Sequence, residues 1–189
     1  MLPSLLLRRS ISTVPGRVSS LSGPVLLTAG GAELHLPPAE GPVGPLADGT
    51  PTYKKGHLCP VSSILRTSTH VGVDPAGKSA KGRVGSGGGE IPWEDARLLA
   101  RSAGLRLLAT LHDQLGGDVG RIEQVLSLRG MVREGEGFTQ HGGVINGCSE
   151  VFIEALGPDK GVGVRVCSGA GASGGAAVSC EVEVRVRPA

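Results

Sequence analysis

The chain has 189 residues, which suits one domain of ordinary size with a short additional segment. Gly and Pro are frequent (32 and 13 residues) and aromatic residues are only 2 % of the chain, so Val, Leu, Ile and Ala must form any core. The net charge is +2, and beyond three early arginines the remainder carries 16 basic against 17 acidic side chains. This near-neutral, ring-poor composition argues against nucleic-acid binding, which uses phosphate neutralisation and aromatic stacking.

The first thirty residues have the composition of a targeting segment. They are rich in Ser and contain Arg8, Arg9 and Arg17 without an acidic residue, as is typical of organelle transit peptides. Their apolar run, Leu5 to Leu7, is too short to span a membrane, which takes about 20 residues. We therefore expect residues 1–30 to be a mitochondrial transit peptide, with a plastid peptide or a plain disordered terminus as alternatives, and residues 31–189 to form the domain.

The next part of the chain predicts extended structure and a turn. Residues 32–52 are rich in Pro and Gly and are expected to be an extended lead-in, and residues 57–70 have β-formers for one or two short strands. Asp74-Pro-Ala-Gly77 is a turn by its chemistry, because Pro presets the backbone at the second position and Gly favours the close. A short strand near Arg83-Val84 would complete a hairpin.

The same turn overlaps a phosphate-binding pattern. Residues 72–79, Gly-Val-Asp-Pro-Ala-Gly-Lys-Ser, match G-x-x-x-x-G-K-[ST]. That loop needs a helix at its end, so that backbone N–H groups and the helix dipole face the phosphates. The Gly-rich residues that follow will not form such a helix, and we reject nucleotide binding.

The remaining elements are two helices and three strands. Pro92 suits the start of a helix, and apolar residues recur at spacings of three and four until Gly116-Gly117. Residues 122–132 alternate as a strand with Leu126, Leu128 and Val132 on the buried face. A second helix carries an apolar stripe from Val144 to Ala155 and ends at Gly157-Pro158.

Two closing strands come last, one with alternating valines at 162, 164 and 166 and one over residues 178–186. In the latter, Val178, Cys180, Val182, Val184 and Val186 face one way and Glu181 faces the other. The order predicts an α+β fold, a mixed β-sheet with two helices packed on one face. The other face needs a partner, and self-association is the simplest source.

No metal or cofactor site is expected from the sequence. The four cysteines form no Cys-x-x-Cys pair, and His57-x-Cys59 lacks a second pair at ligand spacing. Buried small hydrophobes are the better interpretation of most of these thiols. The five histidines are scattered, and each is read as a surface or internally satisfied side chain.

One stretch carries a specific resemblance. It consists of segments in matching order and spacing: Ala96-Arg-Leu-Leu-Ala100, Leu107-Leu-Ala-Thr-Leu111, Leu115-Gly-Gly-Asp118, residues 122–129, Gly137-Phe-Thr139 and Val144-Ile-Asn-Gly147. Together they resemble the RidA/YjgF family of reactive-intermediate deaminases, also called L-PSP endoribonuclease-like or chorismate-mutase-like domains. The resemblance covers about residues 32 to 186.

The resemblance implies a homotrimer whose sheets form a central barrel, with sites in the clefts between subunits. Active members hydrolyse small 2-imino and 2-enamino acids to a keto acid and ammonia without a cofactor. An arginine fork holds the substrate carboxylate, for which bidentate geometry suits Arg better than Lys. A glutamate directs the attacking water.

The family's site residues transfer to this chain in two ways. Arg165-Val-Cys167 resembles its Arg-x-Cys, and Cys180-Glu-Val-Glu-Val184 resembles its last strand. This nominates Arg165 and Glu181 as catalytic and Arg165, Cys167 and Asn146 as substrate-binding. Anchoring on Gly175-Ala-Ala-Val178 instead puts Val164 and Ser179 in the two catalytic roles, and a one-residue slip turns a strand side chain to the opposite face.

Departures from the family pattern keep a second function open. The family's Ser-Gly-Gln reads Ser68-Thr69-His70, its lead-in Tyr is Leu46, and its Leu-Pro after the arginine strand is Ala172-Ser173. The alternative is a catalytically silent member with a structural or assembly role in a larger mitochondrial complex. Endoribonuclease activity ranks third, because the charge and the few aromatics disfavour it.

Overall fold

A six-stranded mixed sheet forms the centre of the protein. In this computed structural model, residues 23–41, 43–169 and 173–188 are described. The sheet has the order β5-β6-β10-β8-β9, and β7 also pairs with β10. The strands are β5 (Gly56–Cys59), β6 (Ile64–Thr67), β7 (His70–Val71), β8 (Ile122–Val132), β9 (Val164–Gly169) and β10 (Val178–Val186). Only β8 and β9 pair in parallel among these strands, so the sheet is mixed, as predicted.

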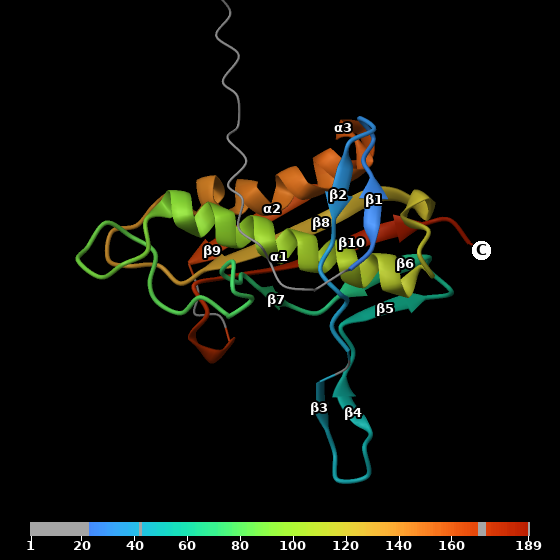
Figure 1. The fold of residues 1–189 in the computed structure, drawn as a ribbon, viewed down its shortest axis with the longest axis horizontal. Coiled ribbons are helices and arrows are strands. Elements are labelled where there is room, and N and C mark those ends of the chain that lie inside the picture. Colours follow the sequence, from blue (N-terminus) through green and yellow to red (C-terminus); the bar gives the residue numbers. More distant parts are fainter. Residues whose placement is uncertain (1–22, 42, 170–172, 189) are drawn as a thin grey trace, which may run out of the picture.

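Both long helices cover the same face of this sheet (Figure 1). They are α1 (Trp93–Gln114) and α2 (His141–Leu156), followed by the short α3 (Pro158–Gly161) and accompanied by 3-10 turns at Val119–Arg121 and Ser173–Gly175. Pro92 immediately precedes α1, and Gly157, with φ +80°, ends α2. The predicted α+β architecture is confirmed.

Helices α1 and α2 cross closely because glycines lie where they meet. A Cβ atom added to Gly104 of α1 would lie 3.1 Å from the carbonyl oxygen of Cys148. A Cβ atom added to Gly147 of α2 would overlap the carbonyl oxygen of Arg97. Side chains at these two positions would push the helices apart, so the sequence uses Gly despite its low helix propensity.

The core lies between this helix pair and the sheet. The alternating apolar residues of β10 are all buried, as the sequence predicted: Val178, Cys180, Val182, Val184 and Val186. The apolar stripe of α2 from Val144 to Ala155 is buried as well. Burying one apolar face of each element in this way supplies the main driving force for folding.

Strand β8 departs from the predicted alternation at one residue. Val184 pairs with Val125 and Glu183 with Ser127, so Leu126 is an extra residue without a partner on β10. This bulge turns Val125 into the core, where it is buried, and leaves Leu126 only half-buried. The prediction that Leu126 shares the buried face with Leu128 was wrong for this reason.

The turn at Asp74 is confirmed, but the hairpin closes earlier than predicted. The Asp74 carboxylate accepts hydrogen bonds from the N–H groups of Ala76 and Lys78, both at 2.9 Å, and Val73 bridges to Ser79. No regular strand forms near Arg83-Val84; Val84 makes only isolated bridges to Ile91 and Glu134. The first closing strand likewise begins at Val164, and Val162 precedes it.

Two small ribbons complete the described chain. Strands β1 (Val25–Leu27) and β2 (Glu33–His35) pair beside the end of α2, where the N–H of Ala29 donates to Ala155. Residues 1–22 of the expected transit peptide lie outside the described residues.

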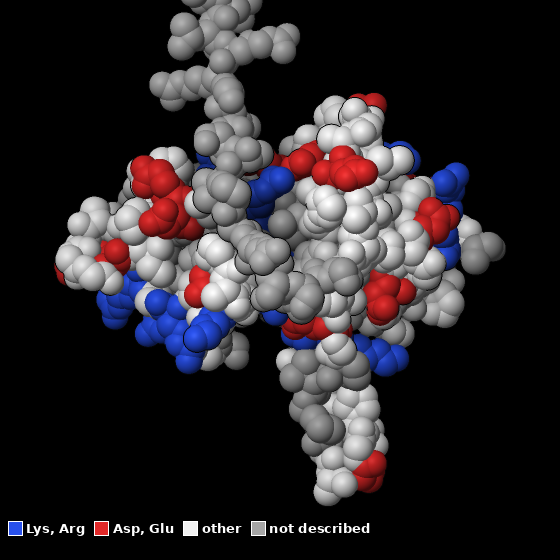
Figure 2. All heavy atoms as spheres, viewed as in Figure 1, with Lys and Arg blue, Asp and Glu red and all other residues white. Residues whose placement is uncertain are grey.

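The second ribbon, β3 (Val43–Pro45) and β4 (Pro51–Tyr53), projects from the body as an arm (Figure 1). Residues 46–54 of the arm are all exposed. Figure 2 shows the described part of the arm as mostly uncharged, whereas acidic and basic groups are interspersed over the body.

The sheet face opposite the helices is mostly polar, with exposed apolar side chains at the β9 edge. Val164 and Val166 of β9 are 69 % and 50 % exposed there. Arg129 of the neighbouring β8 is ion-paired with Glu181 of β10, and Arg66 of β6 is ion-paired with Glu183 of β10 farther across the sheet. In the described part of the chain, no helix is long and apolar enough to cross a membrane.

Candidate functional site

Arg165 points toward helix α2 from the edge strand β9. It pairs with Leu128 of β8, which in turn pairs with Val182 of β10, and both of those side chains are buried beneath the helices. Its guanidinium Nη1 donates to the side-chain oxygen of Asn146 at 2.6 Å and to the Ser149 hydroxyl at 3.2 Å. Arg165 and Asn146, which the resemblance nominated separately, are thus brought together.

This arginine has no carboxylate partner among the described residues. Asn146 and Ser149 are one helical turn apart on α2, and both accept from the same nitrogen of Arg165. Nε and Nη2 donate no hydrogen bond to any other described residue, so these two nitrogens are available for a second acceptor. A guanidinium held by neutral groups in this way suits bidentate binding of an external carboxylate.

A cavity of about 500 Å³ opens beside the guanidinium, between α2 and the beginning of β9. Its polar side consists of Arg165, Asn146 and Ser149, together with Glu150. Glu150 is ion-paired with Arg97 of α1, so its charge is already compensated. The volume lies within the range of small-molecule sites in proteins.

Cys167 lies two residues along β9, on the same side of the sheet as Arg165. It pairs with Gly130, which also pairs with Cys180 of β10, so the two thiols flank a residue without a side chain. Burial raises the pKa of the Cys167 thiol, although the positive Arg165 opposes the shift. A hydrogen bond to Cys180 and burial raise the pKa of Cys148 on α2 well above its usual value. The thiols of Cys167 and Cys148 are therefore protonated near neutral pH and suited to packing or weak hydrogen bonding.

Glu181 lies on the opposite face of the sheet from Arg165. Its pairing partner on β8 is Arg129, whose Nη1 donates to the Glu181 carboxylate at 2.8 Å, and Thr69 donates to the other oxygen at 3.3 Å. Glu181 and Arg129 border a separate cavity of about 240 Å³. Within one copy of the chain, the two predicted catalytic residues do not meet.

The alternative register, which puts Val164 and Ser179 in the two catalytic roles, does not bring a suitable pair of side chains together either. Val164 faces the open side of the sheet, and its apolar side chain offers no group to hold a carboxylate. Ser179 is fully buried two residues before Glu181, and its hydroxyl has no hydrogen-bond partner in the described part of the chain. Of the two registers, the one with Arg165 places a carboxylate-binding group in a cavity.

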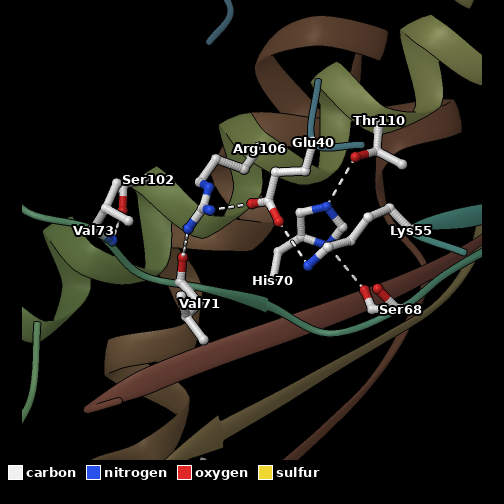
Figure 3. A network of polar contacts seen from close by, with 9 residues as sticks. All are labelled: Glu40, Lys55, Ser68, His70, Val71, Val73, Ser102, Arg106 and Thr110. Carbon is white, nitrogen blue, oxygen red and sulfur yellow. Dashed lines mark hydrogen bonds and ion pairs between the residues drawn. The ribbon is translucent and has the colours of Figure 1, made fainter. Parts of the chain in front are cut away.

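A second polar cluster was not predicted from the sequence (Figure 3). Glu40, at the base of the arm, is ion-paired with Lys55 at 2.6 Å and with Arg106 of α1. His70 lies beside them, fully buried, with Nδ1 bonded to the Ser68 carbonyl at 2.9 Å and Nε2 to the Thr110 hydroxyl at 2.8 Å. The carbonyl can only accept, so Nδ1 carries the proton and Nε2 accepts from Thr110.

This cluster anchors both ends of the arm to helix α1 and makes stability depend on pH. Burial lowers the pKa of His70, and Lys55 and Arg106 act in the same direction. Burial alone would raise the pKa of Glu40, but its bond to Lys55 and the charge of Arg106 outweigh it and lower the pKa. Each group therefore binds a proton more readily in the unfolded chain than in the folded one.

We expect the free energy of unfolding to fall when the pH drops below about 6.5, the ordinary pKa of His. Below that value the unfolded chain protonates His70 while the folded chain does not, which lowers stability by at most about 1.4 kcal/mol per pH unit. Urea unfolding at several pH values would measure this. In His70→Gln, the slope in this range should be shallower; an unchanged slope would contradict the assignment.

The fold is similar to those of several solved structures. No model of a known protein family matches the sequence, and no curated protein is significantly similar to it. Among solved structures, Atu1372 from Agrobacterium tumefaciens, a protein of unknown function, is 22 % identical, with 82 % of this chain and 87 % of that one covered and a TM-score of 0.67.

Two further structures are similar over most of their length. A Shewanella oneidensis MR-1 protein, provisionally described as an endoribonuclease, is 20 % identical over 81 % of this chain and 93 % of its own, with a TM-score of 0.68. The YjgF gene product of Escherichia coli is 19 % identical over 79 % and 94 %, with a TM-score of 0.48. The two structures with TM-scores of 0.67 and 0.68 establish the fold, which is the α+β fold that the sequence predicted.

Proposed function

We propose that this protein is a cofactor-free hydrolytic deaminase of 2-imino and 2-enamino acids. The observation that carries the proposal is Arg165, a guanidinium oriented by neutral oxygens beside an open cavity and without a carboxylate partner among the described residues. In the reaction, water adds to the C=N carbon, the resulting carbinolamine releases ammonia, and a 2-keto acid remains. The acid-free, arginine-bearing beginning of the chain supports a mitochondrial setting.

In this proposal Arg165 binds the substrate carboxylate and Glu181 accepts a proton from the attacking water. The two side chains lie on opposite faces of the sheet, so a site that uses both must combine two copies of the chain. A homotrimer supplies such pairs three times by symmetry. The exposed valines of β9 and the charged residues of the open sheet face offer a surface for that contact.

The experiment follows keto-acid formation from 2-aminoacrylate generated in situ, using an assembly whose oligomeric state is measured first. Arg165→Ala and Glu181→Gln are each expected to lose most of the activity, and mixed oligomers of the two variants should regain part of it, because some clefts then hold both intact residues. Mixed oligomers of wild type with the double variant are the control for exchange. Inactive wild-type oligomers would refute the deaminase, whereas active wild type without regain would refute only the shared site.

The alternative is a catalytically silent subunit with a structural role in a larger complex. The observation that favours it is Glu181, whose two oxygens are already engaged by Arg129 and Thr69. A folded, correctly assembled wild-type protein that hydrolyses neither imines nor enamines would support this alternative. Partner subunits should then co-purify with the tagged chain from mitochondria.

A further inference from the structure

The cavity beside Arg165 has an apolar wall as well as a polar one. The apolar part consists of Val125 and Leu128 from β8, Ile153 from α2 and Val162 from the connection to β9, together with Gly161 and Gly163. Ile153 is half-buried and Val162 is exposed, so two aliphatic side chains stand at the surface of the cavity. A ligand that covered them would remove apolar surface from water, which is favourable.

The two walls define an amphiphilic ligand. The only carboxylate that lines the cavity, Glu150, is paired with Arg97, so it does not neutralise Arg165. The guanidinium of Arg165 therefore favours an anionic ligand. The aliphatic wall favours a ligand in which an apolar group is attached to that anion. The volume of about 500 Å³ is far larger than the three-carbon 2-aminoacrylate requires.

Resting on the proposed function, we infer that the preferred substrates are 2-imino acids with a large apolar side chain, such as that derived from leucine. Their carboxylate binds Arg165, and their side chain lies against Ile153, Leu128 and Val162. Ile153 is then a specificity-determining residue, because it is the side chain of α2 that borders the apolar part of the cavity. Each methylene group that such a wall contacts changes selectivity about 10-fold or more.

The inference is tested by binding, so that it does not depend on turnover. Calorimetry with the full chain compares 4-methyl-2-oxopentanoate with pyruvate, which share the carboxylate and the keto group and differ in the apolar side chain. The larger acid should bind at least about 10-fold more tightly. Arg165→Ala should lose both ligands, which would show that they occupy the cavity beside this residue.

Two substitutions at Ile153 test the wall itself. Ile153→Trp should fill the cavity and weaken 4-methyl-2-oxopentanoate by about 10-fold or more while changing pyruvate little, and Ile153→Ala should reduce the difference between the two acids. Leu98→Trp is the matched control, because Leu98 is 65 % exposed on α1 and does not border the cavity. It should change neither affinity.

The possible outcomes separate the two proposals. Equal affinities for the two keto acids, or equal effects of Ile153→Trp and Leu98→Trp, would overturn the inference even if the wild type hydrolyses 2-aminoacrylate. Selective binding that Ile153→Trp abolishes would support the inference about the ligand even if no imine is hydrolysed. In that case the deaminase proposal fails, and the site is a receptor for apolar 2-keto or 2-imino acids.

Discussion

Replacing Arg165 by Ala is expected to lower kcat/KM for imine hydrolysis by about 10²- to 10³-fold. The substitution removes the guanidinium, and with it the charge-assisted, bidentate contact with the substrate carboxylate. Nη1 is held by Asn146 and Ser149, and the remaining nitrogens of the guanidinium are then directed to the substrate. Lys keeps the charge but not the fork, so Arg165→Lys should recover only a small part of the loss. Steady-state kinetics with a 2-imino acid generated in situ would measure both variants.

The control for this prediction is another arginine that contacts helix α2. Arg101 of α1 is ion-paired with Glu154 of α2 at 2.7 Å and does not border the cavity. Arg101→Ala removes the same positive charge, and the pair is exposed enough that stability should change by less than about 1 kcal/mol. Its activity should stay within about twofold of the wild type. Full activity in Arg165→Ala would exclude this residue as the carboxylate anchor.

The regular elements were predictable because each carries its signal locally. Apolar residues three and four apart identified both long helices, and strict alternation identified β10 together with the face on which Glu181 lies. The orientation of Leu126 was not predictable, because the bulge at this residue depends on the register of β8 with β10. The residues of β8 alone do not encode that register.

The candidate site was predictable only in part, for the same reason. Alternation along β9 separates Arg165 from Val164 and Val166, but it does not say which set faces the helices. That choice depends on the parallel pairing of β9 with β8, where Arg165 meets Leu128. The cluster of Glu40, Lys55, His70 and Arg106 lay beyond sequence reasoning altogether, because its members come from four separate segments and follow no spacing rule.

Gly147→Ala is expected to destabilise the fold by about 1 to 3 kcal/mol, although Ala is the better helix former. The added methyl group would overlap the backbone of Arg97 on α1, and backbone cannot move aside as the end of a flexible side chain can. Gly143, one turn earlier on α2, is the matched control, since a Cβ atom there would make only ordinary van der Waals contacts, with the ring of Trp93 at 3.6 Å and the side-chain oxygen of Gln140 at 3.8 Å. Gly143→Ala should therefore gain about 0.4 to 1 kcal/mol. Urea unfolding at equal protein concentration would compare the two variants, and equal stabilities would mean that α1 and α2 do not cross as closely as described.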